Sequence, residues 1–90
     1  MRFEFDRAKS RTVNRKHGVS LKAAQQIFDQ TYLVDQRNDD LEQFRAIGWC
    51  NGRLCSVIFE IRIDELGEYY HLVTAWKATT EEEQSYAENT

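Results

Sequence analysis

Residues 43–77 decide the fold, and they read QFRAIGWCNGRLCSVIFEIRIDELGEYYHLVTAWK. Within this stretch, Asn51-Gly52 is a strong signal for a two-residue hairpin turn, because both residue types tolerate the positive φ that such a turn requires. Residues 64–67 can form a second turn. Apolar and polar residues alternate between the turns, as in strands with one buried face. We therefore predict a three-stranded antiparallel meander with strands at about 43–50, 53–63 and 68–77.

The residues before this meander predict two short strands and two helices. Residues 2–5 and residues 32–34 have strand character. Between them, Asp6 and Gly18 can cap the two ends of one helix. Ser20 can cap a second helix, which carries apolar residues at helical spacing, namely Leu21, Ala24, Ile27 and Phe28.

After the meander, Thr79 and Glu82 form a capping box for a last helix that ends near Tyr86. The expected fold class is α+β, with two N-terminal helices and one C-terminal helix around an antiparallel meander sheet. Nothing in the chain suggests a linker, so we expect one domain over residues 1–90.

The composition is that of a small globular protein. With 41% hydrophobic residues, 90 residues can bury one core without a metal or disulfides. No apolar run approaches the roughly 18 residues of a membrane span, and the N-terminus lacks the apolar stretch of a signal peptide. We expect a cytoplasmic protein that does not enter the membrane. Cys50 and Cys55 flank the first turn at diagonal positions, so we predict two reduced thiols.

The predicted register assigns the side chains of the meander to two faces. Phe44 then faces Phe59, and Phe59 faces Leu72. The expected core face contains Phe44, Ala46, Cys55, Val57, Phe59, Ile61, Tyr70 and Leu72, with Trp76 near its end. The opposite face is apolar at one end, where we expect Ile47, Trp49, Ile58, Val73 and Ala75. Its other end is polar.

Several polar side chains converge at that polar end. Glu60 lies opposite His71 on one side and opposite Gln43 on the other, with Arg62 and Arg45 nearby. A carboxylate beside an imidazole, with guanidinium groups at hand, has the parts for general acid–base cleavage of a phosphodiester. The alternative is a solvent-exposed ladder of cross-strand ion pairs, which is common in sheets.

Positive charge concentrates in residues 1–28, which hold seven Lys or Arg and two Asp or Glu. Arg7, Arg11 and Arg15 form one stripe along the first predicted helix, and Lys9 and Lys16 lie to another side. Like charges at this spacing destabilise an isolated helix, and a bound anion would offset that cost. RNA phosphates and an acidic partner surface are the two candidates. The alternative is an ordinary solvated face.

Other kinds of site have no support in the sequence. The two histidines and two cysteines lack the spacing of zinc ligands. No serine lies in a nucleophile elbow, and no glycine-rich loop precedes a helix. We predict no bound metal and no cofactor.

Several short motifs occur in an order that is typical of one family. They are Phe3-x-Phe5-Asp6-x-x-Lys9, Asn14-x-x-His17-Gly18-Val19, Ile47-Gly48, Arg62, Ala75-x-Lys77-Ala78-Thr79, and Glu82 four residues before Tyr86. Together they span residues 3–86, and Lys16-His17-Gly18-Val19 is the most specific segment. On these residues the chain resembles the BrnT family of toxin ribonucleases.

The resemblance implies a metal-independent endoribonuclease toxin with a RelE-like fold that inhibits translation and growth. It also implies a co-transcribed BrnA-type antitoxin that contains a DNA-binding ribbon-helix-helix part. In that case the chain would associate with DNA only indirectly, through the antitoxin. Together with the convergence of polar side chains described above, the resemblance makes Glu60, Arg62 and His71 the expected catalytic residues, with Glu60 and His71 exchanging protons. The residues expected to bind RNA are Arg45, Lys77, Arg7, Arg11, Arg15, Lys16 and His17.

The chain departs from the family pattern at several of these places. The family usually has Trp at Phe5, Arg near Gln43, Thr at Glu60, and Arg at His71 and Trp76. The last predicted helix begins with Glu81-Glu82-Glu83, which would repel RNA. The alternative function is therefore a degenerate, noncatalytic module that binds an antitoxin-like partner.

Overall fold

The structure is a computed structural model that describes residues 1–37 and 42–90. In chain order its elements are β1 (Arg2–Glu4), α1 (Arg7–His17), α2 (Leu21–Ala24), the 3₁₀ helix η1 (Gln25–Asp29), β2 (Leu33–Gln36), β3 (Gln43–Cys50), β4 (Arg53–Asp64), β5 (Gly67–Lys77) and α3 (Thr80–Asn89). The predicted α+β class is confirmed, with two helices before the meander and one after it. No helix in the described part of the chain is long and apolar enough to cross a membrane.

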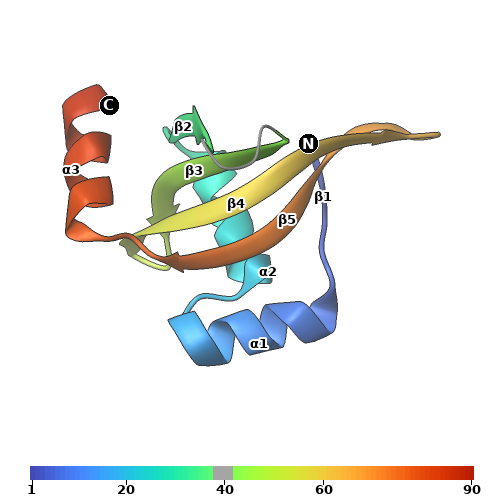
Figure 1. The fold of residues 1–90 in the computed structure, drawn as a ribbon, viewed down its shortest axis with the longest axis horizontal. Helices are drawn as coiled ribbons and strands as arrows, with labels where there is room; N and C mark the ends of the chain where they lie inside the picture. Colours follow the sequence, from blue (N-terminus) through green and yellow to red (C-terminus); the bar gives the residue numbers. More distant parts are fainter. Residues whose placement is uncertain (38–41) are drawn as a thin grey trace.

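The strands form one sheet in the order β1-β5-β4-β3-β2 (Figure 1). Strands β2 to β5 pair in antiparallel fashion, and the meander β3-β4-β5 is as predicted. β1 differs, because it pairs with β5 in parallel. The expectation of an antiparallel meander sheet is thus matched only in part, since no hairpin turn connects β1 to its partner and fixes its direction.

The two turns set the register of the meander. Asn51 (φ 52°) and Gly52 (φ 79°) both adopt the left-handed conformation that a two-residue hairpin turn needs. Phe44 consequently pairs with Phe59, and Phe59 with Leu72, as predicted. At the second turn only residues 65 and 66 lie outside the strands.

A β-bulge exchanges the predicted faces of two residues in β5. Ile58 pairs with Thr74 whereas Phe59 pairs with Leu72, so β5 contains one extra residue between these pairs. As a result Ala75 is fully buried in the core, and Trp76 lies on the opposite face, where it contacts Glu82. The sequence prediction had them the other way round, because a strict two-residue period cannot represent an extra residue.

The helices α1, α2 and η1 cover one face of the sheet (Figure 1). The Asp6 side chain caps α1 by accepting from the Lys9 amide, Gly18 ends α1 with φ 74°, and Ser20 caps α2. Between these helices and the sheet lies a core of Val13, Val19, Leu21, Ala24, Ile27, Ala46, Cys50, Cys55, Val57, Phe59, Leu72 and Ala75.

One residue expected in the core is not there. Ile61 is 44% exposed, because β4 extends past its last pairing with β3 and beyond the covering helices. The two cysteines are buried, unbonded thiols, as predicted.

The opposite face of the sheet has two halves. Helix α3 packs against β3 at one end, and Ile47, Ser56 and Ile58 are buried there. The other half carries a cluster of polar residues that includes Glu60, Arg62 and His71.

Candidate active site

Glu60, His71 and Arg62 lie together on the sheet face opposite α1 and α2. Glu60 and Arg62 are two residues apart on β4, so their side chains leave the same face. His71 of β5 pairs directly with Glu60, and Gln43 of β3 pairs with Glu60 from the other side. The register therefore places these four residues as predicted.

The Glu60 carboxylate is held by hydrogen bonds from both sides. Gln43 Nε2 donates to Glu60 Oε2 at 3.1 Å, while Arg62 Nε and Nη2 donate to Glu60 Oε1 at 3.1 and 2.5 Å. These bonds, that from Gln43 above all, lower the pKa of Glu60 below its usual value. Glu60 is thus ionised at neutral pH, and it fixes the orientation of Arg62, whose side chain is 47% exposed.

His71 is a neutral imidazole at neutral pH. Partial burial lowers its pKa below 6.5, and the positive charges of Arg62 and Lys9 lower it further. The carboxylates of Glu60 and Glu4 act in the opposite direction and do not cancel this effect. A neutral imidazole can accept a proton from a hydroxyl group, so His71 has the protonation state of a general base.

Two further cations, to which the sequence pattern assigns no role, belong to the surroundings of this cluster. Arg2 of β1 pairs with Tyr69, where its guanidinium lies 4.5 Å from the ring centroid, and it forms a 2.6 Å ion pair with Asp64. Lys9 of α1 is near enough to His71 for its charge to lower the pKa of the imidazole. Arg2 was missed because the partner of β1 was unknown. Lys9 had a signal, since it ends the first motif of the family resemblance.

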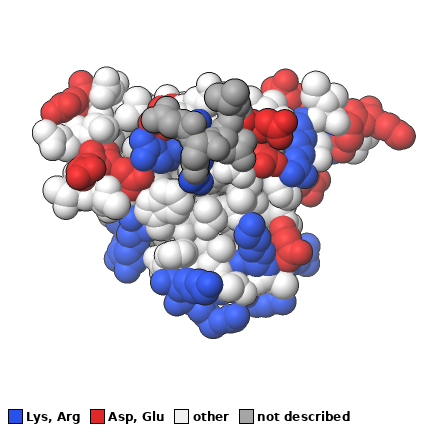
Figure 2. All heavy atoms as spheres, in the orientation of Figure 1, with Lys and Arg blue, Asp and Glu red and all other residues white. Residues whose placement is uncertain are grey.

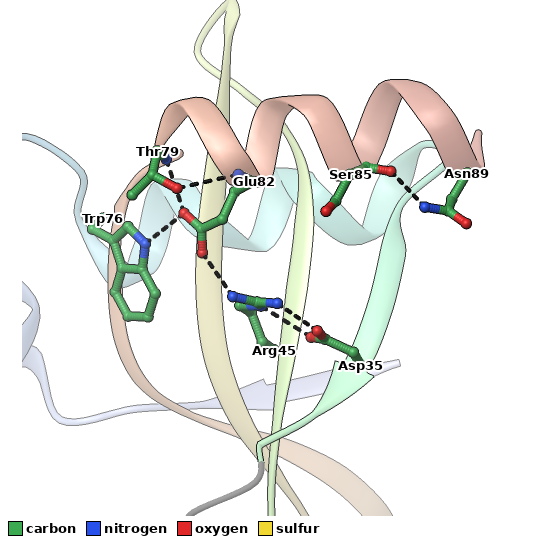
Figure 3. A network of polar contacts seen from close by, with 7 residues as sticks. All are labelled: Asp35, Arg45, Trp76, Thr79, Glu82, Ser85 and Asn89. Carbon is green, nitrogen blue, oxygen red and sulfur yellow. Dashed lines mark hydrogen bonds and ion pairs between the residues drawn. The ribbon is translucent and has the colours of Figure 1, made fainter.

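Arg45 is bound elsewhere. Figure 3 shows its guanidinium between Asp35 of β2, which it contacts through two nitrogens, and Glu82 of α3, at 3.1 Å. Glu82 also accepts from Trp76 Nε1 and from the Thr79 amide, each at 2.9 Å. Two carboxylates therefore compensate the charge of Arg45, and the predicted contact between Arg45 and the Glu60 cluster is replaced by a contact with the C-terminal helix.

Lys77 is also distant from the cluster. It ends β5 six residues after His71, which corresponds to roughly 20 Å along a strand. Its side chain lies beside Gly18, where a Cβ atom would come within 2.8 Å of Lys77 Cε. A positive charge at this point complements the negative end of the α1 dipole. Lys77 thus joins Arg15, Lys16 and His17, which form the last turn of α1.

The remaining predicted cations line a groove on the helical side of the molecule. Arg7 and Arg11 of α1 face Lys22 of α2 across a groove of about 470 Å³, which Phe5, Ser10, Asn14, Ser20 and Gln25 complete. Figure 2 shows Lys and Arg gathered over α1, and Asp and Glu gathered over α3 and at the far tip of the β4–β5 hairpin. On the face shown in Figure 2 the positive surface is that of α1, and the charge of Lys9 on this helix lowers the pKa of His71.

In residues 1–37 and 42–90, no group of three or more His, Cys, Asp or Glu side chains is arranged to hold a metal ion.

One family model matches most of the chain. The model is described as "Ribonuclease toxin, BrnT, of type II toxin-antitoxin system", and it matches residues 5–82. The matched region runs from the start of α1 to the first turn of α3, and it includes the strands that carry Glu60, Arg62 and His71. A comparison with curated proteins finds no match. The chain belongs to the BrnT family of ribonuclease toxins of type II toxin–antitoxin systems.

Proposed function

We propose that this chain cleaves RNA without a metal ion, and that His71, Arg62 and Glu60 carry the reaction. The observation that supports this most is the pairing of Glu60 with His71 on neighbouring strands, with Arg62 fixed beside them by the Glu60 carboxylate. A proton acceptor and a fixed positive charge on one polar face are what phosphodiester cleavage by the ribose hydroxyl requires.

In the proposed reaction the ribose 2′-OH attacks the adjacent phosphorus. His71 accepts the hydroxyl proton, the bond to the 5′-oxygen breaks, that oxygen takes a proton from water, and the resulting hydroxide removes the proton from His71. The products are a 2′,3′-cyclic phosphate and a free 5′-hydroxyl. Arg62 donates hydrogen bonds to the phosphate oxygens as negative charge develops on them. Since the lowered pKa of Glu60 keeps this group ionised, its proposed role is to position Arg62 and not to exchange protons with His71.

Because the Glu60–His71–Arg62 cluster lies on the sheet face opposite α1, the cations of α1 are proposed to hold a part of the RNA backbone at a distance from the reacting nucleotide. Arg7 and Arg11 line an open groove, and the charge of Lys9 lowers the pKa of His71. Arg15, Lys16, His17 and Lys77 extend this positive surface at the other end of α1. We leave Arg45 out of the RNA contacts, because Asp35 and Glu82 already compensate its charge.

The test compares His71→Ala and Arg62→Ala with Arg53→Ala, a matched control on the same strand with an exposed side chain. The wild-type chain is expected to arrest growth on induction and, once purified, to cleave RNA in EDTA. The His71 and Arg62 variants should cleave about 100-fold more slowly or worse, and Arg53→Ala should cleave normally. Undiminished cleavage by the His71 variant, or cleavage that requires added Mg²⁺, would contradict the proposal.

The second candidate is a noncatalytic module that retains only its antitoxin-binding surface. Two observations favour it. The charge of Arg45 is compensated by two carboxylates. The first turn of α3 holds Glu81, Glu82 and Glu83, which would repel RNA. Intact RNA and normal growth, together with retained antitoxin binding, would select this candidate.

The proposed partner is a BrnA-type antitoxin with a ribbon-helix-helix part. Membership of a type II toxin–antitoxin family supports an antitoxin partner, and the resemblance carried by the sequence motifs suggests the BrnA type. A short reading frame directly downstream of the gene, encoding a basic ribbon-helix-helix protein, would support it. An isolated gene would count against it.

A further inference from the structure

The tip of the β4–β5 hairpin exposes aliphatic side chains. Ile63 is 76% exposed and Leu66 is 83% exposed, and Ile61 is 44% exposed. The pairing of β4 with β3 ends at Glu60, and the pairing of β5 with β1 ends at Tyr69. The hairpin consequently projects past both neighbouring strands (Figure 1).

The exposed aliphatic side chains of β4 lie on the same sheet face as the core, but beyond its buried part. Ile61 and Ile63 follow Phe59 at two-residue steps along β4, so all three leave the same face. Phe59 is covered by the helices and is 2% exposed, whereas none of the described helices covers Ile63, which is 76% exposed. Branched aliphatic side chains on an uncovered sheet face are typical of a surface that another protein covers.

Carboxylates flank these aliphatic side chains. Glu68 pairs with Ile63 and therefore lies beside it on the same face, and Glu65 lies in the turn next to Leu66. Acidic side chains also dominate this end of the molecule in Figure 2. Such a surface repels RNA phosphates. It is complementary to a peptide segment with aliphatic side chains next to Lys or Arg.

We propose that Ile61, Ile63, Leu66, Glu65 and Glu68, here called the hairpin patch, form a docking surface for the antitoxin. The antitoxin segment that binds here carries aliphatic side chains flanked by Lys or Arg. This inference rests on the proposed pairing with an antitoxin, and it does not depend on whether the chain is catalytic. Arg62 lies between Ile61 and Ile63 in sequence and leaves the other face, so a segment docked on the patch lies behind the strand that carries Arg62.

The experiment uses the purified full-length chain and the purified protein encoded by the adjacent reading frame. Ile63→Ser combined with Leu66→Ser is expected to weaken their association at least tenfold. The matched control is Val34→Ser, which changes a 43% exposed aliphatic residue on β2 and should change the affinity less than twofold. Glu65→Lys combined with Glu68→Lys should weaken association more at low salt than at high salt.

The controls separate this inference from the proposed function. RNA cleavage by the free chain should be the same for the serine double variant and the wild type, and the circular dichroism should be the same for both double variants and the wild type. Unchanged affinity of both double variants would overturn the inference. A wild-type chain that is dimeric alone, and that the serine variants make monomeric, would reassign the patch to self-association. If the wild-type chain does not bind the adjacent protein, the proposed pairing fails and this inference fails with it, whereas the RNA cleavage proposal stands or falls on its own assay.

Discussion

The carboxylate of Glu82 lies 3.1 Å from the guanidinium of Arg45, and this ion pair joins α3 to β3. The side chain of Glu82 is only 7% exposed, and it also accepts from the Trp76 indole and from the Thr79 amide (Figure 3). Arg45 in turn contacts Asp35 of β2. One continuous set of polar contacts therefore connects β2, β3, β5 and the C-terminal helix.

The first prediction is that Glu82→Gln destabilises the protein. The substitution removes the negative charge of Glu82, which accepts hydrogen bonds from the Arg45 guanidinium, the Trp76 indole and the Thr79 backbone amide. We expect the free energy of unfolding to fall by about 1–3 kcal/mol, measured by urea denaturation. Glu83→Gln, at an exposed position in the same helical turn, is the control and should change it by no more than about 0.5 kcal/mol. Equal losses in the two variants would show that the contacts of Glu82 do not stabilise α3.

Much of the sheet could be predicted because two turns specify its register. Asn51-Gly52 fixes which residue of β3 faces which residue of β4, and alternation then assigns the faces. Two features could not be predicted in this way. The β-bulge reversed Ala75 and Trp76, and the parallel pairing of β1 depends on contacts between the two ends of the chain.

The same distinction applies to the candidate site. Glu60, His71 and Arg62 could be placed together because their relation depends only on local register. Arg45 could not, since its partners Asp35 and Glu82 come from β2 and α3, whose positions no local pattern defines. Lys77 was misplaced because its side chain packs beside Gly18, at the end of a helix distant in sequence.

A second prediction concerns the two thiols. Burial raises the pKa of Cys55 to about 12 and raises the pKa of Cys50 as well, so neither is a thiolate near neutral pH. Native protein treated with iodoacetamide at pH 8 should therefore stay unmodified at both positions, as read by mass spectrometry. The same treatment in denaturant should modify both. Rapid modification of the native protein would show that the hairpin beneath α2 opens readily.

The third prediction is the pH dependence of RNA cleavage. A base acts only when it is unprotonated, so the rate should fall as the pH falls through the pKa of His71, which lies below 6.5. Glu60→Gln should move this acidic limb to still lower pH, because the carboxylate of Glu60 favours protonated His71. Rates of single-turnover cleavage between about pH 4.5 and 8 measure it. An acidic limb that is the same in His71→Ala and wild type would assign the base to another group.

The last prediction concerns Arg7, Arg11 and Arg15 of α1. No acidic residue lies in the first turn of this helix, and Arg7 begins it, so the positive end of the helix dipole adds to the repulsion along the stripe. Replacing all three arginines with Gln should therefore stabilise the helix slightly, by about 0.2–0.5 kcal/mol per pair removed.

The same triple variant should bind single-stranded RNA more weakly. The slope of log Kd against log salt concentration should become shallower by about 2 if each arginine contacts one phosphate. Arg53→Gln, a single exposed arginine at the β3–β4 turn, serves as the control and should change the salt dependence by no more than about 0.7, the value for one phosphate contact. If the triple variant is more stable but binds RNA more weakly, the three arginines serve RNA binding at a cost in stability. Unchanged RNA affinity at low salt would reduce it to an ordinary solvated helix face.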